Sequence, residues 1–257
     1  MNISLRQEEI VGHVRDAGFV TVETLAELFG VTPQTIRRDI NTLCDANLLR
    51  RRHGGAELLD PSVNASYESR RVTRAEAKRR IAAEVARRIP NHASVMIGIG
   101  TTPEIVAQAL RDHEDLTVVT NNLNVAMALA GTRSNRIFVP GGMLRLPDRD
   151  FLGGEVEAFF RSYRADFGIF GVGGIDPDGS LLDFDHAEIQ AREAIRESSH
   201  TSILVADLTK FGRRAAARGG RVGDADLLVT DAEPQGAFAT LLTEADVAFG
   251  YPGRDRP

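Results

Sequence analysis

The stretch Val31-Thr32-Pro33-Gln34-Thr35-Ile36-Arg37-Arg38-Asp39-Ile40-Asn41-Thr42-Leu43 decides how the front of this chain folds. Thr32 is a residue type that caps helices, and Pro33 has the fixed φ of a first helical position, so a helix should begin here. One face is apolar through Ile36, Ile40 and Leu43, and the opposite face is polar. The polar face carries amide and guanidinium groups, which can reach base edges and phosphates in a DNA major groove.

The flanking segments decide whether this helix binds DNA, because two arginines on an exposed helix are usually only solvated surface. Upstream, the apolar spacing predicts two short helices that bury Ile10, Val14 and Ala17 in the first and Leu25 with Leu28 or Phe29 in the second. Thr21 can cap the second helix. Gly30 tolerates the positive φ that the turn before the third helix requires.

A basic hairpin is predicted downstream. Residues 48–52 have the pattern of a strand, His53-Gly54-Gly55-Ala56 that of a tight turn, and 57–59 that of the returning strand. Three helices followed by such a hairpin predict a winged helix-turn-helix domain over residues 1–59. The residues expected to contact DNA lie on the third helix or on the wing: Thr32, Gln34, Thr35, Arg37, Arg38, Asn41, Arg50, Arg51, Arg52 and His53.

The overall composition neither indicates nor excludes a nucleic-acid partner. The 257-residue chain has a formal net charge of −5, and residues 1–59 hold seven arginines against eight acidic residues. Local charge governs contact with phosphate, and the arginines are gathered on one helix and one wing. The single cysteine, Cys44, excludes an intrachain disulfide and offers no metal cluster. Without a secretory pattern or a membrane-length apolar run, we expect a cytoplasmic protein with no membrane contact, no metal and no cofactor.

The rest of the chain predicts a second, α/β domain. Residues 60–73 are polar without periodicity and predict a linker. A charged helix with Ile81, Val85 and Ile89 on one side then ends at Pro90, and residues 74–250 alternate strands and helices. Strands are predicted at 94–99, 116–120, 136–139, 167–171, 202–206 and 227–230, and helices at 103–111, 123–130, 155–161, 187–198 and 235–242. This alternation predicts a parallel sheet covered on both faces.

Ligands of such sheets bind where strands end and helices begin, which directs attention to the segment 97–104. Gly100 permits close backbone approach, Thr101 and Thr102 supply hydroxyl groups, and Pro103 is expected to start a helix whose positive end favours an anion. The alternative is that one of the threonines only caps the helix. The loop by itself favours neither interpretation.

Further polar residues follow other predicted strands. Asn121 and Asn122 can donate and accept hydrogen bonds, as hydroxyl recognition needs, although a helix cap is the alternative. Asp183 and Glu188 flank a helix start, where acids are expected as caps or as acceptors from a polyol. Lys210 follows a strand in Asp207-Leu208-Thr209-Lys210-Phe211-Gly212 and is suited to balance a phosphate charge.

Five blocks resemble the DeoR family of bacterial sugar-phosphate-responsive repressors, and the resemblance covers nearly the whole chain. They are Thr32-Pro33-Gln34-Thr35-Ile36-Arg37-Arg38-Asp39, His53-Gly54-Gly55-Ala56, Gly100-Thr101-Thr102, Thr120-Asn121-Asn122 and Asp207-Leu208-Thr209-Lys210-Phe211-Gly212. The resemblance implies a repressor that binds operator DNA as a homo-oligomer, dimer or tetramer. It also implies a C-terminal domain similar to sugar-phosphate isomerases, whose phosphorylated effector weakens operator binding.

Carried over by position, the resemblance implies an effector pocket lined by Lys78, Gly100, Thr101, Thr102, Asn121, Asn122, Glu188 and Lys210, to which Asp183 is added as a hydroxyl acceptor. Closer family similarity in the segments 99–104, 120–126, 179–185 and 210–213 implies glycerol 3-phosphate, or a related sugar or polyol phosphate, as the effector. One position departs from the family: Gly98 stands where an aspartate is common.

An enzyme is the alternative to a repressor. A sugar-phosphate isomerase with an attached DNA-binding domain would use Glu188 or Asp183 as its general base beside a phosphate pocket. Fold does not determine function, and a winged domain has no role in an isomerase. We therefore expect a regulator without catalytic residues.

Overall fold

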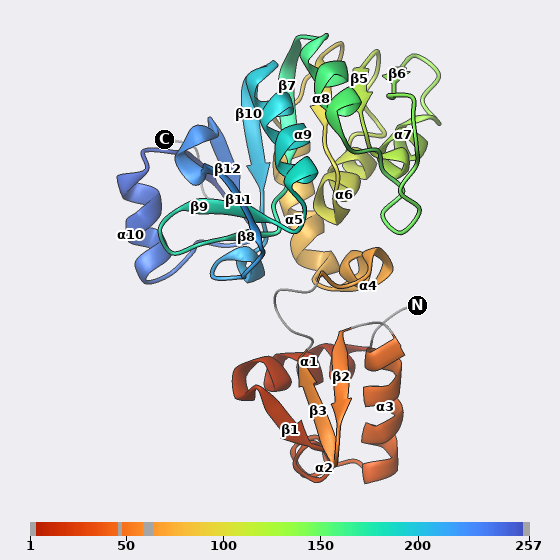
Figure 1. Ribbon diagram of the computed structural model, residues 1–257, viewed down its shortest axis with the longest axis vertical. Coiled ribbons are helices and arrows are strands. Elements are labelled where there is room, and N and C mark those ends of the chain that lie inside the picture. The colour runs from red at the N-terminus through yellow and green to blue at the C-terminus, as the bar shows by residue number, and fades with distance from the viewer. Residues whose placement is uncertain (1–3, 46–47, 59–63, 254–257) are drawn as a thin grey trace. The chain divides into compact units, whose positions relative to one another are not determined.

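The computed structural model describes residues 4–45, 48–58 and 64–253, and the chain divides into two compact units, Met1–Arg74 and Ala75–Pro257 (Figure 1). Each unit has its own buried apolar cluster, one in the first and two in the second.

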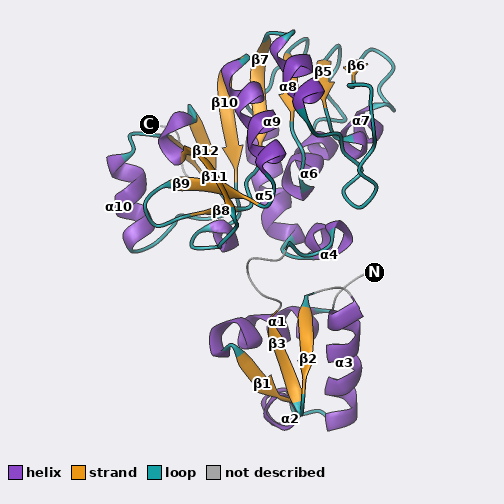
Figure 2. Ribbon diagram, in the orientation of Figure 1, coloured by secondary structure: helices purple, strands orange, loops and turns teal. Residues whose placement is uncertain are grey.

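The described residues of the first unit form four helices and a three-stranded sheet of order β1-β3-β2 (Figure 2). In chain order its elements are α1 (Leu5–Ala17), β1 (Phe19–Thr21), α2 (Val22–Phe29), α3 (Pro33–Asp45), β2 (Leu49–Arg52), β3 (Gly55–Leu58) and a further short helix, α4 (Tyr67–Val72). The order of helices and hairpin confirms the predicted winged helix-turn-helix.

The helix α3 begins where the sequence predicted. The Thr35 amide donates to Thr32 Oγ1 at 3.2 Å, which is an N-cap hydrogen bond. The apolar stripe of Ile36, Ile40 and Leu43 is buried in the core of this unit. Burial of that stripe leaves the opposite face of α3 to solvent.

The turn before α3 is also as predicted. Thr21 caps α2 by accepting from the Thr24 amide at 3.1 Å. Gly30 ends α2 in the left-handed region with φ 60°, and its amide donates to the carbonyl groups at the end of that helix.

One predicted core position of the first unit is wrong, and one of two alternatives is settled. Ala17 is exposed because α1 ends there, and Val11 is buried in its place. Of the two candidates in α2, Leu28 is 54% exposed and Phe29 packs against the core.

The wing has a shorter turn than predicted. Arg52 pairs with Gly55, so only His53 and Gly54 lie in the turn, and Gly55 and Ala56 belong to β3. The strand β1, which the sequence did not predict, pairs antiparallel with β3. A side chain at Gly55 would overlap the carbonyl oxygen of Val20, so this close strand contact requires glycine.

The predicted linker, residues 60–73, is not free of secondary structure. Residues 60–63 lie outside the described residues, but α4 occupies 67–72. Its N-cap is Ser66, whose Oγ accepts from the Ser69 amide at 3.3 Å. The segment is polar and lacks apolar periodicity, so the short helix was not predicted; the Ser66 cap stabilises its start.

The second unit is built on a seven-stranded sheet in which all six pairings are parallel. Its strand order is β13-β12-β10-β7-β4-β5-β6. The strands are β4 (Ser94–Ile97), β5 (Thr117–Thr120), β6 (Arg136–Phe138), β7 (Ala165–Phe170), β10 (Ser199–Val205), β12 (Leu227–Val229) and β13 (Ala248–Gly250). The helices are α5 (Ala75–Ala86), α6 (Thr101–Ala109), α7 (Leu123–Leu129), α8 (Gly154–Arg161), α9 (His186–Glu197) and α10 (Ala237–Glu244).

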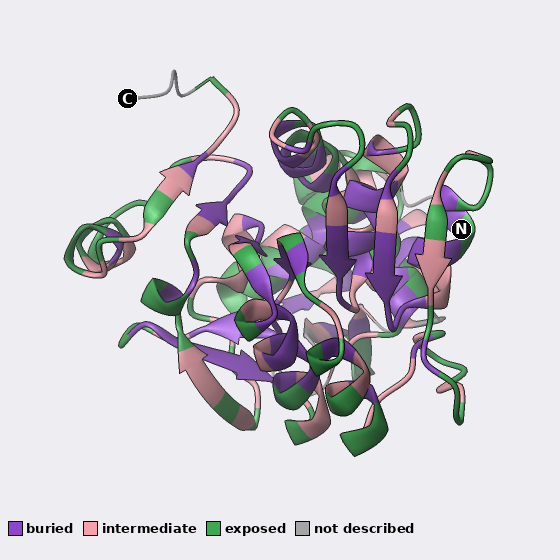
Figure 3. Cartoon of the chain, turned by 90° about the horizontal axis from the view of Figure 1, so that it is seen from above, coloured by how far each residue is buried: buried purple, intermediate pink, exposed green. Residues whose placement is uncertain are grey.

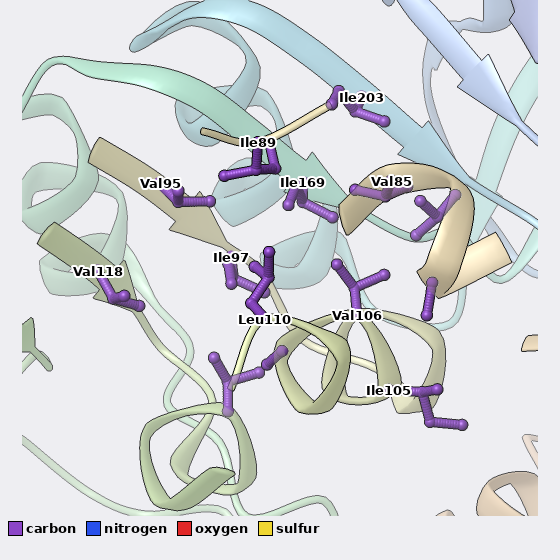
Figure 4. Close-up of a cluster of buried hydrophobic side chains, with 14 of the residues drawn as sticks. Val85, Ile89, Val95, Ile97, Ile105, Val106, Leu110, Val118, Ile169 and Ile203 are labelled. Carbon is purple, nitrogen blue, oxygen red and sulfur yellow. The ribbon is translucent and has the colours of Figure 1, made fainter. Parts of the chain in front are cut away.

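Helices cover both faces of this sheet, as predicted. On one face Val95, Ile97 and Ile169 pack against α5, α6 and α7 (Figure 4). On the other face Met96 and Leu204 pack with side chains of α8 and α9. The central strands are therefore buried on both sides, which explains their continuous apolar sequences (Figure 3).

The structure corrects the prediction for the second unit in four places. The edge strand β13 was not predicted. The helix α5 ends at Ala86, four residues before Pro90. The helix α6 begins at Thr101, so Pro103 is its third residue and not its first. A small antiparallel sheet of β8 (Gly174–Ile175), β9 (Ser180–Asp183) and β11 (Ala217–Arg221) was not predicted.

None of the helices within the described residues combines the length and the apolar character needed to cross a membrane.

Candidate functional site

The exposed face of α3 carries the polar side chains that the sequence singled out. Gln34, Arg37 and Arg38 are exposed and Asn41 is half-buried. Thr32 and Thr35 bond to each other, Oγ1 to Oγ1 at 2.9 Å, so their hydroxyl groups stabilise the start of the helix. Arg37 Nη2 lies 3.6 Å from Glu23 Oε1 in an exposed ion pair, with which DNA phosphates can compete. The amide and guanidinium groups thus face solvent on a helix that its cap and its buried stripe hold in place.

A buried carboxylate that the sequence analysis did not single out ties α3 to α1. Asp39 accepts from Arg6 Nε at 2.8 Å and from Gln7 Nε2 at 2.9 Å. Gln7 is itself half of the capping box that begins α1. The spacing could have predicted this burial, because Asp39 lies three residues after Ile36 and four before Leu43, on the apolar side of the helix.

Glu57 pairs with two of the wing arginines. It lies directly across the hairpin from Arg50, whose Nε donates to Glu57 Oε1 at 2.8 Å, and Arg52 Nη1 lies 3.1 Å from Glu57 Oε2. The hydrogen bond from Arg50 holds the pKa of Glu57 below its usual value. Arg51 and His53 are exposed, and among the described residues Arg51 has no ion pair.

The second candidate site lies at the carboxyl edge of the parallel sheet. From β4 the chain moves to β5 and β6 on one side and then returns to β7 on the other. In parallel sheets such a reversal opens the crevice in which ligands bind. The ends of β10, β7, β4 and β5 are consecutive there, and three of the predicted polar segments, 97–104, 121–122 and 207–212, lie at the ends of β4, β5 and β10. Asp183 belongs instead to β9 of the small antiparallel sheet, and Glu188 to α9.

The end of β4 presents the start of a helix without a side-chain cap. The N-cap of α6 is Gly100, with φ 111°, and no side chain bonds to the first turn. Thr101 and Thr102 are the first two helical residues, so the alternative that one of them caps α6 is wrong. Their backbone amides have no partner within the helix by its geometry, which suits an anion.

The chain contains only two lysines, and the structure brings both to the end of β10. Burial alone would raise the pKa of Asp207, but Lys210, the Thr209 hydroxyl and Lys78 outweigh burial and hold that pKa below its ordinary value. Lys78 comes from α5 and is buried; Lys210 is half-buried. A second buried carboxylate, Asp231, accepts from the Leu208 amide at 2.8 Å and lies 3.5 Å from Arg80 Nη2. Two lysines and Arg80 therefore gather near two carboxylates at this end of the site.

Asn121 and Asn122 follow β5 and are completely buried. Asn121 Nδ2 donates to the Phe151 carbonyl oxygen at 2.8 Å, and Asn122 Oδ1 caps α7 by accepting from the Asn124 amide at 2.9 Å. These contacts fix both amide orientations. They leave Asn121 Oδ1, an acceptor, and Asn122 Nδ2, a donor, without a hydrogen-bond partner within the described residues. Buried polar atoms rarely lack a hydrogen-bond partner, and the hydroxyl group of a ligand could bond to each of these two atoms.

Asp183 is buried beside Arg192, whose Nε lies 3.2 Å from Asp183 Oδ2, and it accepts from the Gly173 amide at 2.7 Å. Burial raises the pKa of Asp183 to about 6, against the effect of Arg192 and together with the charge of Glu188. Asp183 is therefore held mainly by protein groups, and it joins the end of β7 to α9.

Glu188 belongs to an ion cluster that the sequence analysis missed. Arg145, in the loop between β6 and α8, makes two contacts of 2.8 Å with the buried Asp150 and reaches Glu188 Oε1 at 3.1 Å. The Phe184 amide donates to Glu188 Oε2 at 3.3 Å. Hydrogen bonding to Asp150 raises the pKa of Arg145 further above its usual range. The signal in the sequence was an arginine among acids, Arg145, Asp148 and Asp150, between the predicted strand 136–139 and the predicted helix 155–161.

Gly98, the departure from the family pattern, lies under α9. A side-chain carbon there would stand 3.0 Å from Ile195 Cδ1 and 3.6 Å from the Ile169 carbonyl oxygen. An aspartate at this position would therefore require Ile195 to shift.

A winged helix-turn-helix unit followed by a parallel-sheet unit with polar loops at its carboxyl edge defines a DNA-binding regulator with a sensor domain. Family models agree with both parts: the DeoR-like helix-turn-helix domain matches residues 6–62, and the DeoR C-terminal sensor domain matches residues 73–232. The chain belongs to the DeoR family of transcriptional regulators, and it is a repressor rather than an enzyme.

Individual relatives agree with that assignment. The chain is 46% identical over 244 residues to the glycerol-3-phosphate regulon repressor of Escherichia coli K12, covering 95% of this chain and 97% of the relative. It is also 46% identical to the protein of the same name from Haemophilus influenzae, with 92% of each covered. A solved D-ribose-5-phosphate isomerase in complex with phospho-erythronic acid superposes with a TM-score of 0.38 at 17% identity, covering 53% of this chain and 54% of that one.

No group of three or more histidine, cysteine, aspartate or glutamate side chains in the described part of the chain could hold a metal ion.

Proposed function

We propose that this protein represses a regulon for glycerol 3-phosphate, or for a related sugar or polyol phosphate, and that it leaves operator DNA when that phosphate binds the second unit. The observation that carries the proposal is the chemistry of the sheet edge. Uncapped helix amides and two lysines suit a phosphate, while unpaired asparagine atoms suit hydroxyl groups. The two repressors with 46% identity bear the name of the same regulon, which supports the choice of effector.

The proposed effector residues are Lys78, Gly100, Thr101, Thr102, Asn121, Asn122, Asp183, Glu188 and Lys210. We assign the phosphate to the end that holds Thr101, Thr102 and Lys210, because the helix terminus and the ammonium group favour an anion. We assign the hydroxyl groups to the end that holds Asn122 and Glu188. Within this set Asp183 acts mainly by holding the site together, since Arg192 and Gly173 occupy its carboxylate.

The proposed DNA contacts are those of the α3 face and the wing: Thr32, Gln34, Thr35, Arg37, Arg38, Asn41, Arg50, Arg51, Arg52 and His53. We assign DNA binding to residues 1–59, the connection to 60–73 and effector binding to 74–250. One such module makes few contacts, and helix-turn-helix proteins commonly bind paired half-sites, so we propose a dimer or tetramer that acts on operators in the cytoplasm.

The test is an operator-binding titration of the full-length protein at fixed salt against glycerol 3-phosphate and a panel of other sugar and polyol phosphates. We expect glycerol 3-phosphate to weaken operator binding about 5- to 150-fold, the usual range of allosteric coupling. Arg38→Ala should lose operator binding and keep glycerol 3-phosphate binding. Operator affinity that no phosphate in the panel changes would refute the proposal.

A further inference from the structure

The loop that carries Arg145 is built into the proposed effector site. Its residues 145–151, called here the 145–151 loop, lie against the turn that follows β5. The Phe151 amide donates to the Asn121 carbonyl oxygen at 2.9 Å, in addition to the bond from Asn121 Nδ2 to Phe151. The Leu123 amide donates to the Arg149 carbonyl oxygen at 2.9 Å, and Asn124 Nδ2 donates to that of Asp148 at 3.3 Å. The loop therefore fixes the backbone that carries both asparagines.

Arg145 connects this loop to the helix α9. The side chain of Arg145 bonds to the buried Asp150 within the same loop. The Arg145 amide also donates to the Asp150 carbonyl oxygen at 2.8 Å, so these bonds close the loop. Arg145 Nη2 then reaches Glu188 Oε1 at 3.1 Å, in the first turn of α9. A planar guanidinium can hold both contacts at once, which an ammonium cannot.

We propose, resting on the proposed function, that Arg145 is a positioning residue of the effector site and determines its specificity for hydroxyl groups. It fixes Glu188 relative to Asn121 and Asn122, so that acceptors and a donor for a polyol are held at one end. The carboxylates of Asp148, Asp150 and Glu188 all lie within ion-pair distance of the Arg145 guanidinium, with Asp148 at 3.6 Å. Carboxylates gathered in this way disfavour a second anionic group at this end of the ligand.

The experiment is calorimetric titration of full-length wild type, Arg145→Gln and Arg145→Lys with glycerol 3-phosphate and, separately, with inorganic phosphate. We expect Arg145→Gln to weaken glycerol 3-phosphate binding roughly 10- to 100-fold, as for loss of hydrogen bonds to charged groups. Its binding of inorganic phosphate should remain unchanged, because the phosphate end lies elsewhere. Arg145→Lys keeps the charge and loses the planar fork, so its affinity should be intermediate.

Two controls separate positioning from general damage. Arg161→Gln removes the same charge from a surface arginine that pairs with Glu157 and Glu197, and it should leave both ligands unaffected. Arg145→Gln and Glu188→Gln should be non-additive in the double variant, since one contact joins them. Equal loss of both ligands in Arg145→Gln, or unchanged glycerol 3-phosphate binding, would overturn the inference.

A measurement on the ligand-free protein distinguishes failure of this inference from failure of the proposed function. In Arg145→Gln the amide hydrogens of Leu123, Phe151 and Phe184 should exchange at least several-fold faster than in wild type. Their hydrogen bonds join the 145–151 loop to the turn after β5, or end on Glu188, and Arg145 holds both the loop and Glu188 in place. Unchanged exchange would refute the positioning role. If exchange rises but wild type binds no glycerol 3-phosphate, the choice of effector is wrong and the role of Arg145 stands.

Discussion

We expect Glu57 to set how much positive charge the wing offers to DNA. In the free protein its carboxylate is shared by Arg50 and Arg52, whose side chains are both more than half exposed. Exposed ion pairs are weak, so operator phosphates can compete for these arginines when the wing fits its site. On ill-fitting DNA we expect the pairing to persist, so that Arg51 carries the wing charge.

Glu57→Gln should therefore bind non-specific DNA more tightly and lose discrimination. The plot of log affinity against log salt should steepen by about 1 to 2, since up to two more arginines meet phosphates. Fluorescence anisotropy with operator and scrambled duplexes over a salt series measures both effects. Glu9→Gln, an equal charge change on the exposed side of α1, is the control. Identical salt slopes in the two variants would contradict the assignment.

Asp183 should make the stability of the second unit depend on pH. Its pKa rises from an ordinary 3.8 to about 6 in the folded state, so the native protein binds this proton more tightly than the unfolded chain. The stability that this carboxyl contributes is therefore present at low pH and is lost as pH rises from about 4 through about 6. The shift corresponds to roughly 3 kcal/mol.

The measurement is the free energy of unfolding of wild type and Asp183→Asn across that range. Relative to the variant, wild type should lose roughly 3 kcal/mol as pH rises. The difference between the two proteins isolates this carboxyl from all others that titrate. Parallel profiles would show that the Arg192 charge, and not burial, dominates at this site.

At the scale of elements, Asp39 determines how α3 sits on its unit. Asp39→Ala leaves the buried Gln7 amide without its partner and should destabilise the first unit by about 1–3 kcal/mol. Arg38→Ala, one position away on the exposed face, should leave stability unchanged and weaken operator binding. Thermal unfolding and operator binding of both variants check the pair. Equal stability of Asp39→Ala and wild type would show that core packing alone orients the helix.

Helices and strands could be predicted where the pattern of apolar residues shows which side of the element is buried. The strands β4, β5 and β10 each contain a short apolar run, and α3 has a cap and a stripe, so the sequence located them to within a few residues. The small antiparallel sheet was not predicted, because β8 (Gly174–Ile175) is too short to show an alternating apolar pattern and β11 is rich in glycine and arginine. Pro103 misled because the backbone conformation of Gly100, which no pattern shows, started α6 two residues earlier.

The candidate sites were predictable only in part for a related reason. Residues on strand ends and helix starts, such as Thr101 and Asn121, have positions that the alternation of elements fixes. Arg145, Asp39 and Glu57 act through partners that are distant in sequence or on a neighbouring strand. Spacing along one element does not reveal such pairs.

At the scale of the whole molecule, DNA release should require the second unit to bind its effector. The double variant Thr101→Val with Lys210→Met removes a hydroxyl group and a charge from the proposed phosphate end. We expect it to retain operator affinity and to stay on DNA at glycerol 3-phosphate concentrations that release wild type. Thr117→Val, at the opposite end of β5, is the control, and both are tested by operator titration. Normal release by the double variant would move the pocket elsewhere.

The scarcity of lysine gives this protein a built-in reporter. With 29 arginines and only Lys78 and Lys210, the side-chain amines of the whole chain are gathered around Asp207. Reductive methylation with a carbon-13 label would thus place its side-chain resonances at the sensor edge alone. The arrival of a small molecule there would be visible in a spectrum of two side-chain signals, without any DNA in the tube.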